Sequence, residues 1–131
     1  MIDTFGRSIT YLRVSVTDLC NLRCRYCMPD GAKILEHEEV LTHEEFLRLA
    51  ALFAQCGIDT VRVTGGEPLV QLDFVTEFFR LMKKEGVHTC VDTAGQPFRR
   101  DPEWLDRFNE LMSLTDLFMR DLKQVDSMVH V

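Results

Sequence analysis

The sequence has no apolar run that approaches the roughly 20 residues of a membrane-spanning helix, and its N-terminus lacks the pattern of a signal peptide. Basic residues are not in excess, because 15 Lys and Arg against 21 Asp and Glu give a net charge of −6, which indicates no binding surface for nucleic acid. Internal repeats, low-complexity tracts and linkers are also absent. These absences predict a cytoplasmic protein with no membrane or nucleic-acid partner, and its 131 residues predict a single domain.

Cysteine is present, but in a number and spacing that do not suit a disulfide framework. Of the five cysteines, three form a C-x3-C-x2-C run at Cys20, Cys24 and Cys27, while Cys56 and Cys90 stand apart. An odd, clustered set favours metal ligation over the disulfides of a secreted protein. We expect Cys56 and Cys90 to be buried and to behave as small hydrophobic residues.

The run of three cysteines predicts an iron–sulfur cluster with one open iron. A structural cluster is normally closed by four thiolates, so three thiolates leave a position that a small molecule can complete. A zinc site is a second interpretation, but zinc usually takes four ligands from paired Cys or His residues, and the sequence has no second pair. Inert thiols are the third interpretation.

Hydrophobic periodicity predicts four strands that alternate with three helices. The strands are expected at residues 11–17, 60–64, 87–93 and 117–122. The helices are expected to begin at a capping box of Thr42 and Glu45, at Asp73, and at the pair Asp101-Pro102. A βαβαβαβ order with short connections requires a parallel sheet with right-handed crossovers, so the predicted fold class is α/β.

Polar motifs follow the strands at the points where the strands end. The cysteine run follows the first strand, and the later strands are followed in turn by Gly65-Gly66-Glu67, by Asp92-Thr93, and by Asp121 and Lys123. Parallel α/β proteins bind their ligands at the carboxyl ends of the strands, so these motifs are expected to share one rim. The two glycines allow a ligand to approach the backbone, and Glu67 offers a carboxylate to an ammonium group. A simple tight turn is the alternative interpretation of the glycine pair.

Strand alternation directs two carboxylates and a lysine, from Asp92, Asp121 and Lys123, into the interior of a barrel. Such groups are costly to bury unless they bind something. A hard cation with oxygen ligands, or the carboxylate of a bound ligand, would satisfy them. A capped strand end with a surface ion pair is the alternative.

The cysteine run, with the aromatic Tyr26 before its last cysteine, resembles the signature of radical S-adenosylmethionine (radical SAM) enzymes. The resemblance implies a 4Fe–4S cluster on Cys20, Cys24 and Cys27 as the catalytic centre, with SAM chelating the open iron. It implies reductive cleavage of SAM to methionine and a 5′-deoxyadenosyl radical, driven by an external one-electron reductant of the flavodoxin or ferredoxin type. Tyr26 is then expected beside the adenine, and Gly65-Gly66-Glu67 resembles the motif that binds the SAM amino group. The implied fold is a (β/α)6 partial TIM barrel, of which this sequence carries about four strands and three helices.

The resemblance to individual families differs between two parts of the chain. Residues 1–69, which include Leu-Arg-Val-Ser-Val-Thr-Asp-Leu-Cys-Asn-Leu-Arg-Cys and Thr-Gly-Gly-Glu-Pro-Leu, resemble the GTP cyclase of molybdenum cofactor biosynthesis. In that family an arginine that matches Arg13 helps to bind the GTP substrate. Residues 70–131, which include Val-His-Thr-Cys-Val-Asp-Thr and Thr-Asp-Leu-Phe-Met-Arg-Asp-Leu-Lys, resemble pyruvate formate-lyase activating enzyme. This second resemblance implies a monovalent cation on Asp92, Thr93, Met119 and Asp121, and a contact between Lys123 and the SAM carboxylate.

The sequence also departs from both families. It has no second set of three cysteines for the additional cluster of the cyclase, and it has neither the later barrel strands nor the means to grip a glycyl-radical partner. We therefore expect a truncated, chimeric radical SAM core of the cyclase lineage, in which uncoupled SAM cleavage is favoured over turnover of a substrate. Activation of a glycyl-radical enzyme is the second interpretation, and a non-catalytic scaffold that only binds an iron–sulfur cluster is the third. Open edges at the first and fourth strands predict either a loose monomer or a homodimer.

Overall fold

The computed structural model describes residues 1–18, 20 and 39–121. In chain order the elements are β1 (Tyr11–Ser15), α1 (His43–Gln55), β2 (Thr60–Thr64), the 3-10 helix η2 (Pro68–Gln71), α2 (Leu72–Lys84), β3 (His88–Thr93), α3 (Pro102–Ser113) and β4 (Leu117–Arg120). The strands pair in parallel in the order β1-β2-β3-β4, so strand order in space follows strand order in the chain. The predicted α/β class, with four parallel strands and three helices of a partial barrel, is confirmed.

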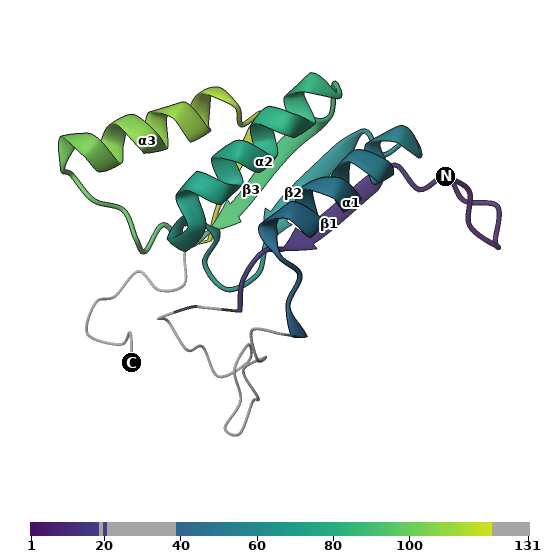
Figure 1. Ribbon diagram of the computed structural model, residues 1–131, viewed down its shortest axis with the longest axis horizontal. Helices are drawn as coiled ribbons and strands as arrows, with labels where there is room; N and C mark the ends of the chain where they lie inside the picture. The colour runs from purple at the N-terminus through teal and green to yellow at the C-terminus, as the bar shows by residue number, and fades with distance from the viewer. Residues whose placement is uncertain (19, 21–38, 122–131) are drawn as a thin grey trace.

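The three helices lie on one face of the sheet (Figure 1). Strand alternation explains this arrangement, because Val61, Val63 and Val91 are completely buried and belong to one hydrophobic core with the helix residues Phe78 and Phe79. Burying a side chain of this size contributes about 1.5–3 kcal/mol. The opposite face of the sheet carries polar and charged side chains, and in a closed or partial barrel this is the inner face.

Two of the three predicted helix starts are confirmed by their capping contacts. Thr42 caps α1 in a complete capping box with Glu45, whose carboxylate accepts a hydrogen bond from the Thr42 backbone N–H at 2.8 Å. The Asp101 side chain caps α3 by accepting from the backbone N–H of Trp104 at 3.0 Å.

The predicted start of the second helix at Asp73 is wrong. The 3-10 turn that opens at Pro68 runs directly into α2 at Leu72, so Asp73 already lies inside the first helical turn and has no free helix end to cap. Its carboxylate instead forms a two-point contact with Arg107 of α3, at 2.5 and 2.8 Å. Asp73 therefore joins two helices on the outside of the molecule.

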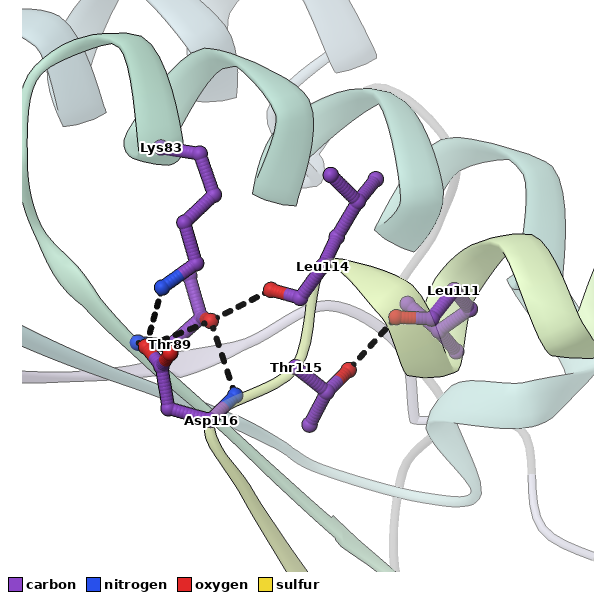
Figure 2. A network of polar contacts seen from close by, with 6 residues as sticks. All are labelled: Lys83, Thr89, Leu111, Leu114, Thr115 and Asp116. Atoms are coloured by element: carbon purple, nitrogen blue, oxygen red, sulfur yellow. Dashed lines mark hydrogen bonds and ion pairs between the residues drawn. The ribbon is translucent and has the colours of Figure 1, made fainter.

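The amino ends of β3 and β4 are joined by a polar network around Asp116 (Figure 2). The Asp116 carboxylate accepts from the backbone N–H of Thr89 at 2.8 Å and from the ammonium group of Lys83, and the Thr89 hydroxyl donates to the carbonyl oxygen of Leu114 at 2.6 Å. Burial acts to raise the pKa of Asp116, but the hydrogen bonds from Lys83 and Thr89 outweigh it and lower the pKa from 3.8 to about 2. The network fixes the α3–β4 connection at the end of the sheet opposite the predicted rim.

The sheet remains open at both sides among the described residues, where β1 and β4 are its edge strands. Beside β1, beneath α1, lies a cavity of about 220 Å³ that is lined mainly by apolar side chains, including Leu12, Val14 and Phe53. The homodimer, in which a second copy of the chain would cover the edge strands β1 and β4, stays a prediction. No helix in the described residues has the length and apolar character needed to cross a membrane.

Candidate functional site

Among the described residues, Glu67 is the most deeply buried charged side chain at the carboxyl ends of the strands, with only 1% of its surface exposed. One carboxylate oxygen accepts from the backbone N–H of Leu69 at 3.1 Å and from the hydroxyl of Thr93, and the other accepts from the backbone N–H of Ala94 at 2.9 Å. The Thr93 hydroxyl in turn accepts from the backbone N–H of Gly95 at 2.9 Å. The turn after β2 is thus tied to the end of β3 by one buried carboxylate.

These contacts define what Glu67 does in the structure. A carboxylate has about four acceptor positions, and three of those on Glu67 are taken by protein donors. Among the described residues Glu67 has no ion pair with a lysine, arginine or histidine. The predicted contact between Glu67 and a ligand ammonium group stays a prediction, whereas its role in positioning the backbone of the turn is visible in the contacts.

Gly65 brings this turn against the end of β1. Its φ of +86° lies in the region that favours glycine, and a Cβ at this position would lie 2.0 Å from the Ser15 hydroxyl oxygen and 2.8 Å from the carbonyl oxygen of Thr17. No side chain fits in that space. The Gly65-Gly66 pair is therefore more than a tight turn, because it seats the loop after β2 on the backbone segment that leads into the cysteine run.

Cys20 is the one residue of the predicted cluster ligands that the structure describes, and it is a partly exposed free thiol just beyond the end of β1. Cys24, Cys27, Tyr26 and Lys123 lie outside the described residues. Within residues 1–18, 20 and 39–121, no group of three or more His, Cys, Asp or Glu side chains could hold a metal ion. The cluster site therefore stays a prediction, and its one described ligand follows the carboxyl end of β1 in the chain.

The residues predicted to hold a monovalent cation come from adjacent strands, as expected. Asp92 is in register with Met119, and the backbone N–H of Asp121 donates to the carbonyl oxygen of Thr93 at 2.9 Å. The side chains of Asp92 and Thr93 already have protein partners, however. The Asp92 carboxylate accepts from the guanidinium of Arg62 at 2.6 Å, and the Thr93 hydroxyl donates to Glu67. A cation at this position would share the Asp92 carboxylate with the guanidinium of Arg62. The cation site itself stays a prediction.

Arg62 is the residue of the inner face that sequence reasoning missed. It is in register with Arg13 across β1 and β2, and Cys90 is its neighbour on β3. Arg13 donates to the hydroxyl of Thr64 at 3.3 Å, so two arginines in register contribute their side chains to the same face of the sheet. Hydrogen bonds from Arg62 to Asp92, and then to Tyr11, raise the pKa of Arg62 above its ordinary value. The alternation of β2 could have found Arg62, since it shares a face with Thr64 just before the glycine pair.

The two isolated cysteines behave differently from one another. Cys90 is buried in β3, as predicted, and burial raises the pKa of its thiol. The prediction that Cys56 is buried is wrong: Cys56 follows the last turn of α1, where it is exposed and its carbonyl oxygen accepts from the N-terminal ammonium group at 3.0 Å. A helix C-terminus at the surface does not bury its cap residue, which explains the difference.

Taken together, the contacts define a class: a parallel, barrel-like α/β protein whose strand ends are tied together at one edge, the edge at which proteins of this class bind their ligands. The chain belongs to the radical SAM superfamily, whose family model matches residues 14–130. The match begins within β1 and covers β2 to β4 and helices α1 to α3, and it includes the cysteine run.

Individual relatives carry names from molybdenum cofactor biosynthesis. The GTP 3′,8-cyclase of Heliobacterium modesticaldum is 56% identical over 95 residues, which are 72% of this chain and 29% of that protein. The GTP 3′,8-cyclase of Geobacter sulfurreducens is 48% identical over 95 residues, with the same shares of the two chains. Human molybdenum cofactor biosynthesis protein 1 is 49% identical over 97 residues, which are 72% of this chain and 15% of that protein.

The chain spans less than a third of the length of these curated relatives. Alignments of 95 residues are longer than residues 1–69, so the similarity to the cyclases continues beyond the part for which it was predicted. The resemblance of residues 70–131 to pyruvate formate-lyase activating enzyme, and the division of the chain near residue 69, stay predictions.

Proposed function

We propose that this chain binds a 4Fe–4S cluster through Cys20, Cys24 and Cys27, binds SAM along the rim, and cleaves SAM reductively. Membership of the radical SAM superfamily supports the cluster and SAM as cofactors. The cysteine run supplies three thiolates, which suit an iron–sulfur cluster with one open iron. When bound, the cluster and SAM supply one-electron cleavage of a carbon–sulfur bond and hence a carbon radical.

The observation that carries the proposal is the contact between Gly65 and the end of β1. Because the Gly65 backbone lies against Ser15 and Thr17, the turn after β2 is held beside the segment from which the cysteine run departs. A ligand on the open iron would meet this backbone, whose carbonyl and N–H groups suit the amino and carboxylate groups of an amino acid. The Glu67 carboxylate positions this backbone by accepting hydrogen bonds from the backbone N–H groups of Leu69 and Ala94.

Other residues have roles that follow from the resemblance. Tyr26 is proposed to lie beside the adenine, and Lys123 to contact the SAM carboxylate. A monovalent cation on Asp92, Thr93, Met119 and Asp121 is a further candidate. Superfamily members generally need an external reductant, and a flavodoxin or ferredoxin type suits a proposed location in the cytoplasm.

The substrate lineage we propose is that of the GTP cyclases. Arg13, with Arg62 in register beside it, places two guanidinium groups on the inner face, where they suit the phosphates of a nucleotide. The similarity to proteins named GTP 3′,8-cyclase supports this lineage over activation of a glycyl-radical enzyme.

Formation of 5′-deoxyadenosine tests the proposal. After anaerobic reconstitution with iron and sulfide, we expect the protein to convert SAM to 5′-deoxyadenosine and methionine when dithionite is present. Liquid chromatography with mass spectrometry measures both products. Cys20→Ala is expected to abolish the product, while Cys56→Ala removes an exposed thiol outside the run and is expected to retain it. Iron binding without SAM cleavage in the wild type would instead support the non-catalytic scaffold.

A further inference from the structure

The inner face of the sheet carries an unbalanced arrangement of charge. Arg13 and Arg62 are directly opposite one another in parallel register, and like charges in such positions destabilise a sheet. Arg62 has Asp92 as its partner, with a distance of 2.6 Å between the guanidinium and carboxylate atoms. Arg13 has no carboxylate partner among the described residues, and it donates instead to the hydroxyl of Thr64.

The ion pair between Arg62 and Asp92 leaves part of the hydrogen-bonding capacity of the guanidinium unused. One guanidinium nitrogen, Nη2, donates to one carboxylate oxygen, whereas Arg62 Nε is buried without a hydrogen-bond partner in the described residues. A planar guanidinium can make two parallel hydrogen bonds to one anion, and a buried nitrogen with no acceptor is costly. Arg62 therefore retains a donor that its present partner does not satisfy.

We propose that Asp92 is a specificity-determining residue, an internal anion that occupies Arg62 and competes with the phosphate groups of a ligand at the Arg13–Arg62 pair. This inference rests on the proposed function, in which the two arginines bind the phosphates of a nucleotide. It adds that the Asp92 carboxylate, on the neighbouring strand β3, competes with those phosphates for Arg62. Asp92 lies two strands from Arg13 and one from Arg62, so it weakens one half of the pair and leaves the other free. A phosphate that binds between the two arginines must displace or repel the Asp92 carboxylate.

The same residue has a different role if the predicted cation site exists. As a cation ligand, Asp92 would support SAM binding in the presence of potassium, and its removal would weaken that binding. As a competitor, its removal strengthens phosphate binding and does not depend on potassium. Titrations of one substitution with SAM and with phosphate therefore distinguish the two roles.

Calorimetric titration of the reconstituted protein with inorganic triphosphate and with GTP tests the proposal. Asp92→Asn keeps the shape of the side chain and removes its charge, and we expect triphosphate to bind about tenfold more tightly, as for loss of one competing, partly exposed ion pair. Asp106→Asn removes the same charge from an exposed position on α3 and is the matched control, with no change expected. In the double variant Arg62→Gln/Asp92→Asn the gain is expected to disappear.

Equal or weaker triphosphate binding by Asp92→Asn would overturn the proposal, and so would the absence of binding by both proteins. An equal gain in Asp106→Asn would also overturn it, because the effect would then be one of net charge. A SAM-dependent change in the electron paramagnetic resonance signal of the same preparations reports the proposed function separately. A protein that responds to SAM but shows no gain on Asp92→Asn would retain the proposed function and lose this inference.

Discussion

A carboxylate accepts hydrogen bonds from backbone N–H groups at each end of the sheet, but the charged groups around the two carboxylates differ. At the amino ends, Asp116 accepts from the backbone N–H of Thr89 in β3, and Lys83 balances its charge. At the carboxyl ends, Glu67 also accepts from backbone N–H groups and a threonine hydroxyl of β3, but no described residue balances its charge. Among the described residues, the carboxylate at the amino ends therefore has a lysine partner, and the buried carboxylate at the carboxyl ends has no cationic partner.

This difference between Asp116 and Glu67 indicates that one carboxylate serves the stability of the fold and that the other also serves ligand binding. In barrel-like α/β proteins, conserved chemistry at the carboxyl ends of strands serves ligands and that at the amino ends serves stability. A buried carboxylate without a cation is costly, and a positively charged ligand group near the rim would reduce that cost. We infer that changes at Glu67 affect both folding and SAM binding, whereas changes at Asp116 affect folding alone.

Replacing Glu67 is expected to have the largest effect. Glu67→Ala leaves three buried donors without their acceptor, which should lower the free energy of unfolding by about 4 kcal/mol and abolish SAM binding. Glu67→Gln keeps one acceptor oxygen and should lose about half as much. Urea unfolding and SAM titration measure the two effects. A variant that loses less than about 1 kcal/mol would show that these donors find other partners.

Gly65→Ala comes next. Its new Cβ would meet Ser15 and the Thr17 carbonyl oxygen in a left-handed backbone conformation, so we expect a loss of about 3 kcal/mol and weaker SAM binding. Gly86→Ala is the matched control, since Gly86 has a similar φ of +71° and open space around its Cβ position. It should lose only about 1 kcal/mol. Equal losses in thermal or urea unfolding would mean that close approach at Gly65 costs nothing.

Asp116→Asn is expected to cost about 2 kcal/mol at neutral pH without a change in SAM affinity. The folded-state pKa of about 2 lies below the ordinary 3.8, so the carboxylate stabilises the fold fully above the ordinary value and loses that contribution as pH falls towards 2. Denaturation followed between pH 5 and pH 2 should therefore show a steeper acid loss in the wild type than in Asp116→Asn. Parallel curves would contradict the role given to this network.

The smallest effect is expected at the helix cap Asp101, which lies in neither network. Asp101→Ala removes the acceptor for the Trp104 N–H and should cost about 1 kcal/mol with unchanged SAM affinity. Asp101→Asn retains a capping oxygen and should lose only a few tenths of that. A change in SAM affinity in Asp101→Ala would show that stability losses alone disturb the rim.

Much of the fold followed from local signals in the sequence. The alternation of Thr60–Thr64 and the capping residues Thr42 and Asp101 predicted elements that the structure confirms. The start of α2 did not follow, because Asp73 has the character of a cap residue while the 3-10 turn at Pro68 takes that place. Local sequence does not report which of two adjacent turns continues into the helix.

The site was predictable as a set of strand ends but not as a set of contacts. Alternation correctly placed Asp92 on the inner face, yet its pairing with Arg62 depends on the register between β2 and β3. Likewise the sequence indicated Gly65 and Glu67, whereas the close approach to Ser15 and the bond to Ala94 depend on how separate strands meet. Contacts between strands distant in sequence are the part that a pattern along one strand does not contain.

The most direct test of the central claim is electron paramagnetic resonance of the anaerobically reconstituted, reduced protein with and without SAM. We expect a 4Fe–4S signal that changes when SAM is added. That change should be lost in Glu67→Ala under conditions where the variant remains folded, and retained in Asp116→Asn. A cluster signal that is indifferent to SAM in the wild type would contradict the claim that the rim binds SAM beside an open iron.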